Sequence, residues 1–430
     1  MSAWLSSFGI YGRPRLVAIG FMGFSSGLPL PLTLGTLSYW LAEQGVSRTT
    51  IGLFTLVGLP YSFKFLWSPL MDRLPLPGLT VRLGRRRGWL LLVQALLAVA
   101  ILALGLGNPR AAPIATALAA LAVAFLSASQ DIVIDAYRIE LLRPEEQGAG
   151  AAATQWGYRF GMIAGSAGAL VAAAEGGWHV AYAVMAALMG VGMATVWLTP
   201  EPRVALPAAA PGAGAWFKSA VAAPFADLVR RDGWFAILLF IVLYKFGDAL
   251  AGVMSNPLYV ALGFTKGEVA AISKVFGVLA TLVGIAAGGV VVARLGLYRA
   301  LLICGVLQML SNLAYAAQVM AGHDVAMLAV TIAAENFTGG MGSAAFVAYL
   351  SQLCNLAFTA TQYALLSSLA SVGRTVLAAS GGWLAQRLDW VPFFGLATLA
   401  CLPGLALLLW LMRQEGTALG AVMPASREGG

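Results

Sequence analysis

Charged side chains are scarce in this sequence: Asp, Glu, Lys and Arg together account for 10% of its 430 residues. A soluble domain normally carries about a quarter charged residues. Hydrophobic residues account for 60% of the chain, so it lacks the polar surface that water requires. The composition therefore excludes an ordinary soluble domain and predicts an integral membrane protein.

Cysteine and histidine are also rare. Cys304, Cys354 and Cys401 lie in or beside apolar runs, and an odd number without paired spacing indicates neither a disulfide framework nor a metal site. His179 and His323 are far apart in the sequence. A Walker A motif is absent, so nothing indicates that ATP drives a process. We expect no metal and no cofactor.

Long apolar runs dominate what is present. A helix that crosses a bilayer needs about 20 apolar residues, and lipid offers its backbone groups no other partner, so such runs are expected to be helices. The first run follows Arg13 and Arg15 and is longer than the core of a cleavable signal peptide, which predicts a membrane helix that is retained. The twelve stretches that qualify are 14–42, 49–71, 88–107, 112–141, 148–175, 178–199, 233–261, 268–293, 298–321, 325–353, 358–386 and 391–412.

The net charge of +8 comes mainly from basic residues in the loops, which indicates membrane orientation rather than binding to nucleic acid. Of the 26 Lys and Arg residues, five lie inside the spans away from their ends, 17 lie in loops or span ends on the side shared by the termini, and four lie on the other side. Basic residues gather on the cytoplasmic side of membrane proteins, so both termini are expected in the cytoplasm. The four on the other side are Arg48, Arg110, Lys266 and Arg387.

An internal repeat divides the chain. LGRRRGWLLL (83–92) resembles LGLYRALLIC (295–304), and YRFGMIAGSAGALVA (158–172) resembles GRTVLAASGGWLA (373–385). Many transporters are built from two repeats with the substrate path between them. The predicted domains are a six-helix bundle over 1–200, a linker with an amphipathic surface helix over 201–232, and a six-helix bundle with a short tail over 233–430.

Charges inside the spans follow a pattern. Spans 3, 6, 9 and 12 carry none away from their ends, as expected if every third helix faced lipid and the others lined a cavity. This layout matches the major facilitator superfamily and predicts an all-α integral membrane protein with twelve transmembrane helices in two pseudo-symmetric six-helix bundles. The charged residues of the other spans are Lys64, Asp131, Asp135, Arg159, Lys245, Asp248, Lys274, Glu335 and Arg374.

Two carboxylates four residues apart, Asp131 and Asp135, share one face of span 4. One interpretation is structural, with both acids neutralising arginines such as Arg138 and holding the bundle together. The other is a proton switch, because a carboxylate in a medium of low dielectric takes up a proton unless a nearby cation offsets its charge. The candidates for proton coupling are Asp131, Asp135, the rival Glu335 in span 10, and Asp248.

Five bases against four acids in the spans would make a cavity slightly positive, which favours an anionic or zwitterionic solute. Amides would add the hydrogen bonds that a sugar or peptide needs, although they also join membrane helices. Gly27 lies in FSSGLPLPLTLG, which is expected to break its helix and expose backbone to substrate, or to form a packing kink. The substrate-binding candidates are Gly27, Lys64, Gln130, Gln155, Arg159, Tyr244, Lys245, Asn256, Asn336 and Arg374.

The loop between spans 2 and 3 combines SPLMDRL (68–74) with LGRRRG (83–88), as recurs in this superfamily. Asp72 could cap or pair at a neighbouring helix end and lock a cytoplasmic gate, and the arginines could anchor to anionic lipid. The alternative is that the loop only determines topology. The predicted gating residues are Asp72, Arg73 and Arg138.

Several stretches together resemble the anhydromuropeptide permease (AmpG) family: PYSFKFLWSPLMDRL, LGRRRGWLLLVQ, SASQDIVIDAYRIELLRPEEQGAGAA, GYRFGMIAG, NPLYVALGFTKGEVA and ENFTGGMGSAAFVAYLSQLCN. The resemblance covers about residues 16–412. It implies an importer in a bacterial inner membrane that is driven by the proton-motive force. We also expect a monomer that works by alternating access. Its cargo would be GlcNAc-1,6-anhydro-MurNAc peptides, whose import serves peptidoglycan recycling and, in some bacteria, β-lactamase induction and β-lactam resistance. Some relatives are longer and carry further hydrophobic segments.

Two other functions stay open. A drug or small-molecule efflux transporter would have the same fold. A membrane enzyme acting on lipid-linked sugars would need a catalytic acid or metal cluster near one interface; only Asp131 and Asp135 qualify, and no metal-ligand spacing accompanies them. We therefore expect a transporter and not an enzyme, with a solute, protons and the lipid bilayer as its partners.

Overall fold

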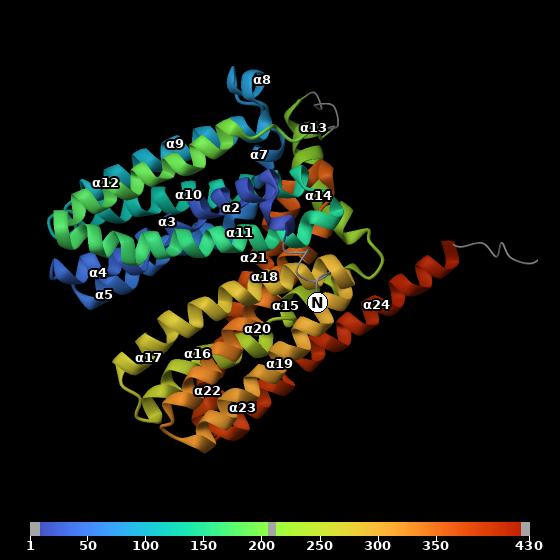
Figure 1. Ribbon diagram of the computed structural model, residues 1–430. Coiled ribbons are helices and arrows are strands. Elements are labelled where there is room, and N and C mark those ends of the chain that lie inside the picture. Colours follow the sequence, from blue (N-terminus) through green and yellow to red (C-terminus); the bar gives the residue numbers. More distant parts are fainter. Residues whose placement is uncertain (1–8, 205–211, 423–430) are drawn as a thin grey trace, which may run out of the picture. The chain divides into compact units, whose positions relative to one another are not determined.

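The computed structural model describes residues 9–204 and 212–422, and every element in these ranges is a helix (Figure 1). Part of the predicted linker and the end of the tail lie outside the described residues, as do the side chains of Arg48, Lys266 and Lys274. The first half contains, in chain order, η1 (Gly9–Gly12), α2 (Pro14–Gly27), α3 (Pro29–Thr33), α4 (Gly35–Glu43), α5 (Arg48–Leu53), η2 (Phe54–Gly58), α6 (Leu59–Phe63), η3 (Lys64–Leu66), α7 (Ser68–Arg73), α8 (Leu79–Leu83), α9 (Arg85–Gly105), α10 (Pro113–Leu141), η4 (Pro144–Glu146), α11 (Gln147–Ile163), η5 (Ala164–Gly168) and α12 (Ala169–Leu198).

The linker region and the second half follow in the same way. Their helices are α13 (Ala213–Phe217), η6 (Lys218–Ala222), α14 (Ala223–Val229), α15 (Trp234–Leu243), α16 (Phe246–Ala261), α17 (Lys266–Ile272), η7 (Ser273–Gly277), α18 (Val278–Leu295), α19 (Leu297–Ala321), α20 (Val325–Gln352), η8 (Leu356–Phe358), α21 (Thr359–Ala378), α22 (Ser380–Arg387), α23 (Trp390–Leu399) and α24 (Leu402–Val422).

Nine helices within the described ranges are long and apolar enough to cross a membrane. One of them, Pro144–Leu198, contains predicted spans 5 and 6, which meet at Gly177 with φ +80°. Predicted span 10 is the helix α20, and predicted span 2 is a series of short helices from α5 to α7. The chain is thus a multi-pass membrane protein.

Packing divides the chain into two compact units. Unit 1 comprises Met1–Ala226 together with Val347–Ser368, and unit 2 comprises Asp227–Phe346 together with Leu369–Gly430. The break after Ala226 falls inside the predicted linker over 201–232. Val347–Ser368 differs from the predicted domains, because the repeat assigns it to the bundle over 233–430 whereas its contacts lie in unit 1. We call Val347–Ser368 the crossing segment.

Each unit has its own apolar core. In unit 1, α9 lies beside α12 and α2 lies beside α11 (Figure 1). Leu97, Ile101 and Val123 are completely buried there, together with Met189. The core of unit 2 is formed by α16, α19, α20 and α23, where Phe393 and Phe394 are completely buried.

Two lysines lie where a membrane helix is interrupted. Lys64 begins the 3-10 turn η3 between α6 and α7, and Lys245 separates α15 from α16 with φ −105° and ψ 12°. Pro60 and Pro69 stand in the first turns of α6 and α7, where a missing N–H is tolerated. Irregular backbone at membrane depth is tolerated only inside protein or beside water, so both lysines mark such places.

Glycines let α2 and α11 touch through their backbones. A Cβ at Gly157 would stand 1.8 Å from the carbonyl oxygen of Gly20, and one at Gly161 would stand 2.2 Å from that of Phe24. The same holds for Gly27, where it would stand 2.1 Å from the carbonyl oxygen of Tyr158. Small residues at such spacings are typical of close helix pairs in lipid. α2 ends at Gly27 and α3 begins at Pro29, but Leu28 between them keeps helical angles of φ −64° and ψ −41°. Gly27 itself is buried as a packing residue.

We expect Gly157→Ala to lower the free energy of unfolding by about 1–3 kcal/mol, because the added methyl group overpacks a backbone contact. Thermal unfolding in detergent measures the loss. Gly190→Ala on α12 is the matched control, since a Cβ there meets nothing within 4 Å. Equal melting temperatures for Gly157→Ala and Gly190→Ala would contradict the close α2–α11 contact.

Candidate functional site

The two carboxylates of α10 both lie inside unit 1, on one face of a continuous helix of 29 residues. The hydroxyl of Ser26 on α2 donates a 2.5 Å hydrogen bond to Oδ1 of Asp131. Lys64 follows the break in span 2, and its Nζ lies 3.9 Å from Oδ2 of Asp135. Lys64 also interacts electrostatically with Asp131. One ammonium group therefore interacts with both acids.

Arg138 adds a second cation to this group, one turn further along α10. Its Nη2 lies 3.6 Å from Oδ1 of Asp135, which is an ion pair but too long for a hydrogen bond. The side chain is completely buried, and its three nitrogen atoms have no hydrogen-bond acceptor among the described residues. Its guanidinium carbon lies 5.4 Å from the ring centre of Tyr363 on α21. We call Lys64, Asp131, Asp135 and Arg138 the charged cluster.

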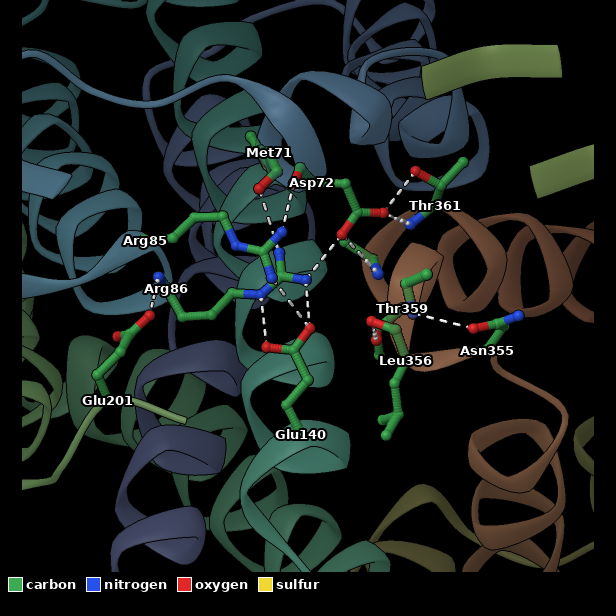
Figure 2. Close-up of polar contacts among 12 residues, drawn as sticks. Met71, Asp72, Arg85, Arg86, Glu140, Glu201, Asn355, Leu356, Thr359 and Thr361 are labelled. Atoms are coloured by element: carbon green, nitrogen blue, oxygen red, sulfur yellow. Dashed lines mark hydrogen bonds and ion pairs between the residues drawn. The ribbon is translucent and has the colours of Figure 1, made fainter. Parts of the chain in front are cut away.

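A second buried network surrounds Asp72 at the end of α7 (Figure 2). Its Oδ1 accepts a 3.1 Å hydrogen bond from the backbone N–H of Ala360. Its Oδ2 accepts 2.7 Å bonds from both the N–H and the hydroxyl of Thr361. Asp72 thus caps the first turn of α21, where a carboxylate is favoured by the unpaired N–H groups and the helix dipole.

Arg86 connects Asp72 to α10. Its Nη2 donates to Oδ1 of Asp72 at 2.7 Å and to Oε1 of Glu140 at 2.5 Å, and Nε donates to Oε2 of Glu140 at 3.0 Å (Figure 2). Arg85 donates to the carbonyl of Asp72. Arg86 is completely buried, and its charge pairs with acids inside the protein. The prediction that this arginine anchors to anionic lipid is therefore wrong.

The start of α9, where Arg86 lies, is also bonded to the end of the first bundle. Both carboxylate oxygens of Glu201 accept hydrogen bonds from backbone N–H groups of α9, from Arg86 at 2.8 Å and from Arg87 at 3.0 Å. The side chain of Arg87 in turn donates to the carbonyls of Val196 and Trp197 at the end of α12. Helix termini leave such groups unpaired, so the two ends cap each other.

All three predicted gating residues contact the crossing segment. Asp72 binds Ala360 and Thr361, as described above. The guanidinium carbon of Arg73 lies 5.2 Å from the ring centre of Phe358. Arg138 lies against Tyr363.

The linker helix also contacts the crossing segment. The buried amide of Gln362 donates a 3.1 Å bond to the carbonyl of Pro224 on α14 and accepts a 2.7 Å bond from the N–H of Asn355. The predicted amphipathic stretch contains the helices α13 and α14. A carbonyl of α14 accepts a hydrogen bond from α21.

Unit 2 contains a separate polar group around Lys245. Its Nζ donates a 2.7 Å hydrogen bond to Gln308 on α19 and lies 3.4 Å from Oδ2 of Asp248. Gln308 also donates to Asp248. Arg374, exposed on α21, interacts electrostatically with Asp248. The sequence pattern of apolar spans 3, 6, 9 and 12 gave no reason to expect Gln308, a neutral residue of span 9, in this network.

Three substrate-binding candidates are engaged in helix packing. The completely buried amide of Gln130 exchanges hydrogen bonds with Ser25, joining α10 to α2. Tyr244 donates to the carbonyl of Leu301 at 2.9 Å and stacks on Phe346. Asn336 accepts from Thr281 and donates to a carbonyl of its own helix. The remaining candidates, Gln155, Arg159 and Asn256, are half-buried, exposed and exposed respectively.

Glu335 lies on α20, half-buried, and interacts electrostatically with Tyr259 and Tyr315. It belongs to unit 2 and so does Asp248, whereas Asp131 and Asp135 belong to unit 1. Within the described part of the chain, no group of three or more His, Cys, Asp or Glu residues is arranged to hold a metal ion.

Comparison with known proteins gives both family and fold relationships. A family model described as acetyl-coenzyme A transporter 1 matches residues 16–170. The anhydromuropeptide permease of Escherichia coli K12 is 44% identical over 402 residues, which are 93% of this chain and 80% of the relative. The putative transporter AmpG 4 of Rickettsia felis is 35% identical over 412 residues, covering 94% of this chain and 98% of the relative.

Two solved transporters share the fold. The fucose:proton symporter of E. coli matches with a TM-score of 0.68 at 12% identity, over 95% of this chain and 98% of that chain. The proton:xylose symporter of the major facilitator superfamily matches with a TM-score of 0.61 at 12% identity, over 96% of each chain. These likenesses confirm the predicted major facilitator fold, and at such identities they carry nothing further.

We expect Arg86→Met to lower the free energy of unfolding by about 3–5 kcal/mol, because it leaves Asp72 and Glu140 buried without their shared cation. The control is Arg231→Met, which removes a half-exposed partner of Asp227 and should cost about 1 kcal/mol or less. Thermal unfolding of both variants in detergent measures the difference. Similar losses from both would show that the Asp72 network contributes no more than a surface ion pair.

Proposed function

Because the chain belongs to the anhydromuropeptide permease (AmpG) family, we propose that it is a proton-driven symporter that imports GlcNAc-1,6-anhydro-MurNAc peptides for peptidoglycan recycling. The transport runs from the periplasm to the cytoplasm across a bacterial inner membrane. Both termini lie in the cytoplasm, an orientation supported by the 17 basic residues on their side of the chain against four on the other.

The observation that carries this proposal is the charged cluster. Ionisable groups at membrane depth are costly and persist where they serve ion or substrate pathways. In unit 1 two acids share one lysine, and the second acid also faces Arg138. Such a group can accept a proton, and protonation of one acid leaves Lys64 and Arg138 with a single carboxylate between them.

Proton uptake changes the charge balance of the cluster. With both acids ionised, Lys64 and Arg138 face Asp131 and Asp135, and the four formal charges cancel. A proton that enters from the periplasm binds one carboxylate and leaves the cluster with one excess positive charge. An anionic solute bound nearby compensates that excess, which is a physical reason for protons and a peptide-bearing muramyl sugar to move together.

Several polar residues, half-buried or exposed, are available for the solute. In unit 1, Gln155 and Arg159 are four residues apart and share one face of α11. In unit 2, Asn256 and Arg374 are exposed on α16 and α21. An arginine of either unit has the positive charge and the planar donor group that a carboxylate of a muropeptide requires.

The cytoplasmic gate in this proposal is the set of contacts between Asp72, Arg73 and Arg138 and the crossing segment. Each contact joins a residue of the first sequence repeat to a residue of the second. Alternating access requires such contacts to break once in every cycle. The buried Asp72 network would then hold the gate closed while the solute enters from the periplasm.

We expect Asp131→Asn and Asp135→Asn each to abolish accumulation of a labelled GlcNAc-1,6-anhydro-MurNAc peptide in proteoliposomes with an inward proton gradient, because an amide cannot carry the proton. Asp227→Asn is the matched control, since that acid pairs with Arg231 in the linker region and should leave accumulation unchanged.

Wild-type accumulation in both cluster variants would remove the proton role of the charged cluster. Failure of the wild-type protein itself to take up the muropeptide would instead reject the substrate.

A further inference from the structure

Tyr363 lies where the two buried networks of unit 1 approach each other. It belongs to the first turns of α21, its ring is 4% exposed, and Arg138 lies against it. Two residues earlier, Thr361 binds Asp72 through both its N–H and its hydroxyl. A short stretch of one helix therefore contacts both the charged cluster and the Asp72 network.

The two networks are also joined through α10. Asp135 and Arg138 of the charged cluster precede Glu140 on that helix, and Glu140 binds Arg86, which binds Asp72. From Asp72 the path continues through Thr361 to the turn that carries Tyr363. The contacts thus form a closed cycle, and a change in one contact alters the free energy of the others.

Arg138 is the residue of this cycle whose ion pair depends on the protonation of Asp135. Its guanidinium is fully buried without a hydrogen-bond acceptor among the described residues. In the part of the chain that the structure describes, its charge meets the carboxylate of Asp135 and the ring of Tyr363, and Lys64 lies near the same carboxylate. A buried ion that loses its only counter-ion is strongly destabilising, and a ring face compensates for this only in part.

We propose that Tyr363 is a positioning residue that transmits the protonation of Asp135 to the cytoplasmic gate through Arg138. This role rests on the proton-driven transport proposed above. When Asp135 is ionised, Arg138 is paired and Tyr363 covers it, so the crossing segment stays in place. A proton from water adds to the carboxylate oxygen, and Arg138 then lacks a counter-ion while it remains sealed under the ring.

When the crossing segment moves away, water reaches the guanidinium of Arg138. This hydration removes the free-energy cost of the unpaired buried charge. The proton later leaves Asp135 for cytoplasmic water, the ion pair re-forms, and the ring closes over it again. The other ionisable groups that face this place are Lys64 of η3 and Asp131 of α10, with Cys354 beside Tyr363 and Tyr61 beside Asp131. Among them, only Asp135 contacts Arg138 directly as an ion pair within the described residues.

The test separates coupling from stability. Tyr363→Leu removes the ring and Tyr363→Phe keeps it. Tyr182→Leu removes a buried tyrosine of α12 whose hydroxyl donates to the carbonyl of Leu32. Each variant is assayed in proteoliposomes for accumulation of the labelled muropeptide under an inward proton gradient and for its exchange without a gradient. The wild-type protein run in parallel shows whether the muropeptide is a substrate at all.

In Tyr363→Leu we expect accumulation to fall about tenfold while exchange stays within about twofold of wild type, since the lost ring interaction is of that order. Tyr363→Phe is expected to keep both activities, and Tyr182→Leu is expected to keep their ratio even if its melting temperature falls. An unchanged ratio in Tyr363→Leu, or an equal loss in Tyr363→Phe, overturns the proposal.

A second measurement needs no transport and uses the wild-type tyrosine. Cys354 lies half-buried in the crossing segment, whereas Cys304 and Cys401 are buried in unit 2 and are replaced by serine for this experiment. Asp135→Asn imitates the protonated acid and is expected to raise the rate of Cys354 labelling by a thiol reagent about tenfold, because the segment leaves more often. An unchanged labelling rate overturns the proposal even if muropeptide transport is established.

Discussion

Everything in unit 1 depends on one constraint: an ion surrounded by apolar helices needs an opposite charge within a few ångströms. Asp135 meets that need for two cations, with Lys64 at 3.9 Å and Arg138 at 3.6 Å. Neither distance is that of an optimal hydrogen bond, so neither partner holds the carboxylate exclusively. A carboxylate held at these distances is protonated more readily than one in a single tight ion pair, and its protonation leaves the buried Arg138 without that partner.

The Asp72 network has the opposite character. Its hydrogen bonds are short, Arg86 reaches two carboxylates and a carbonyl, and Asp72 also satisfies the first turn of α21. Both networks include residues of α10. The weakly paired Asp135 therefore lies on the same helix as Glu140, which belongs to the tightly bonded Asp72 network. This division of labour fits a transporter, which needs a proton site that changes state easily and a gate that opens only when that state has changed.

The sequence was sufficient for the membrane class, the helical stretches, the fold and the family, because the apolar runs and the positions of charges within them are local properties. It also drew attention to Asp72, Arg73 and Arg138, which contact the crossing segment, since charged residues at the ends of spans stand out. Gln130, Tyr244 and Asn336 were less predictable, because an amide or hydroxyl that joins helices has the same side chain as one that binds a solute. Arg86, Glu201 and Tyr363 were missed because Glu140, Arg86 and Arg138, with which they respectively pair, lie 54, 115 and 225 residues away, and no local pattern in one sequence reports such pairings.

The central claim is that the charged cluster of α10 is where the transported proton binds. Infrared difference spectroscopy of the protein in lipid tests this directly, because the carbonyl stretch of a protonated carboxyl group is resolved from that of a carboxylate. On acidification the account predicts a protonated-carboxyl band in the wild-type protein that disappears in Asp135→Asn and persists in Asp248→Asn. A band that is unchanged in both Asp131→Asn and Asp135→Asn would contradict the claim.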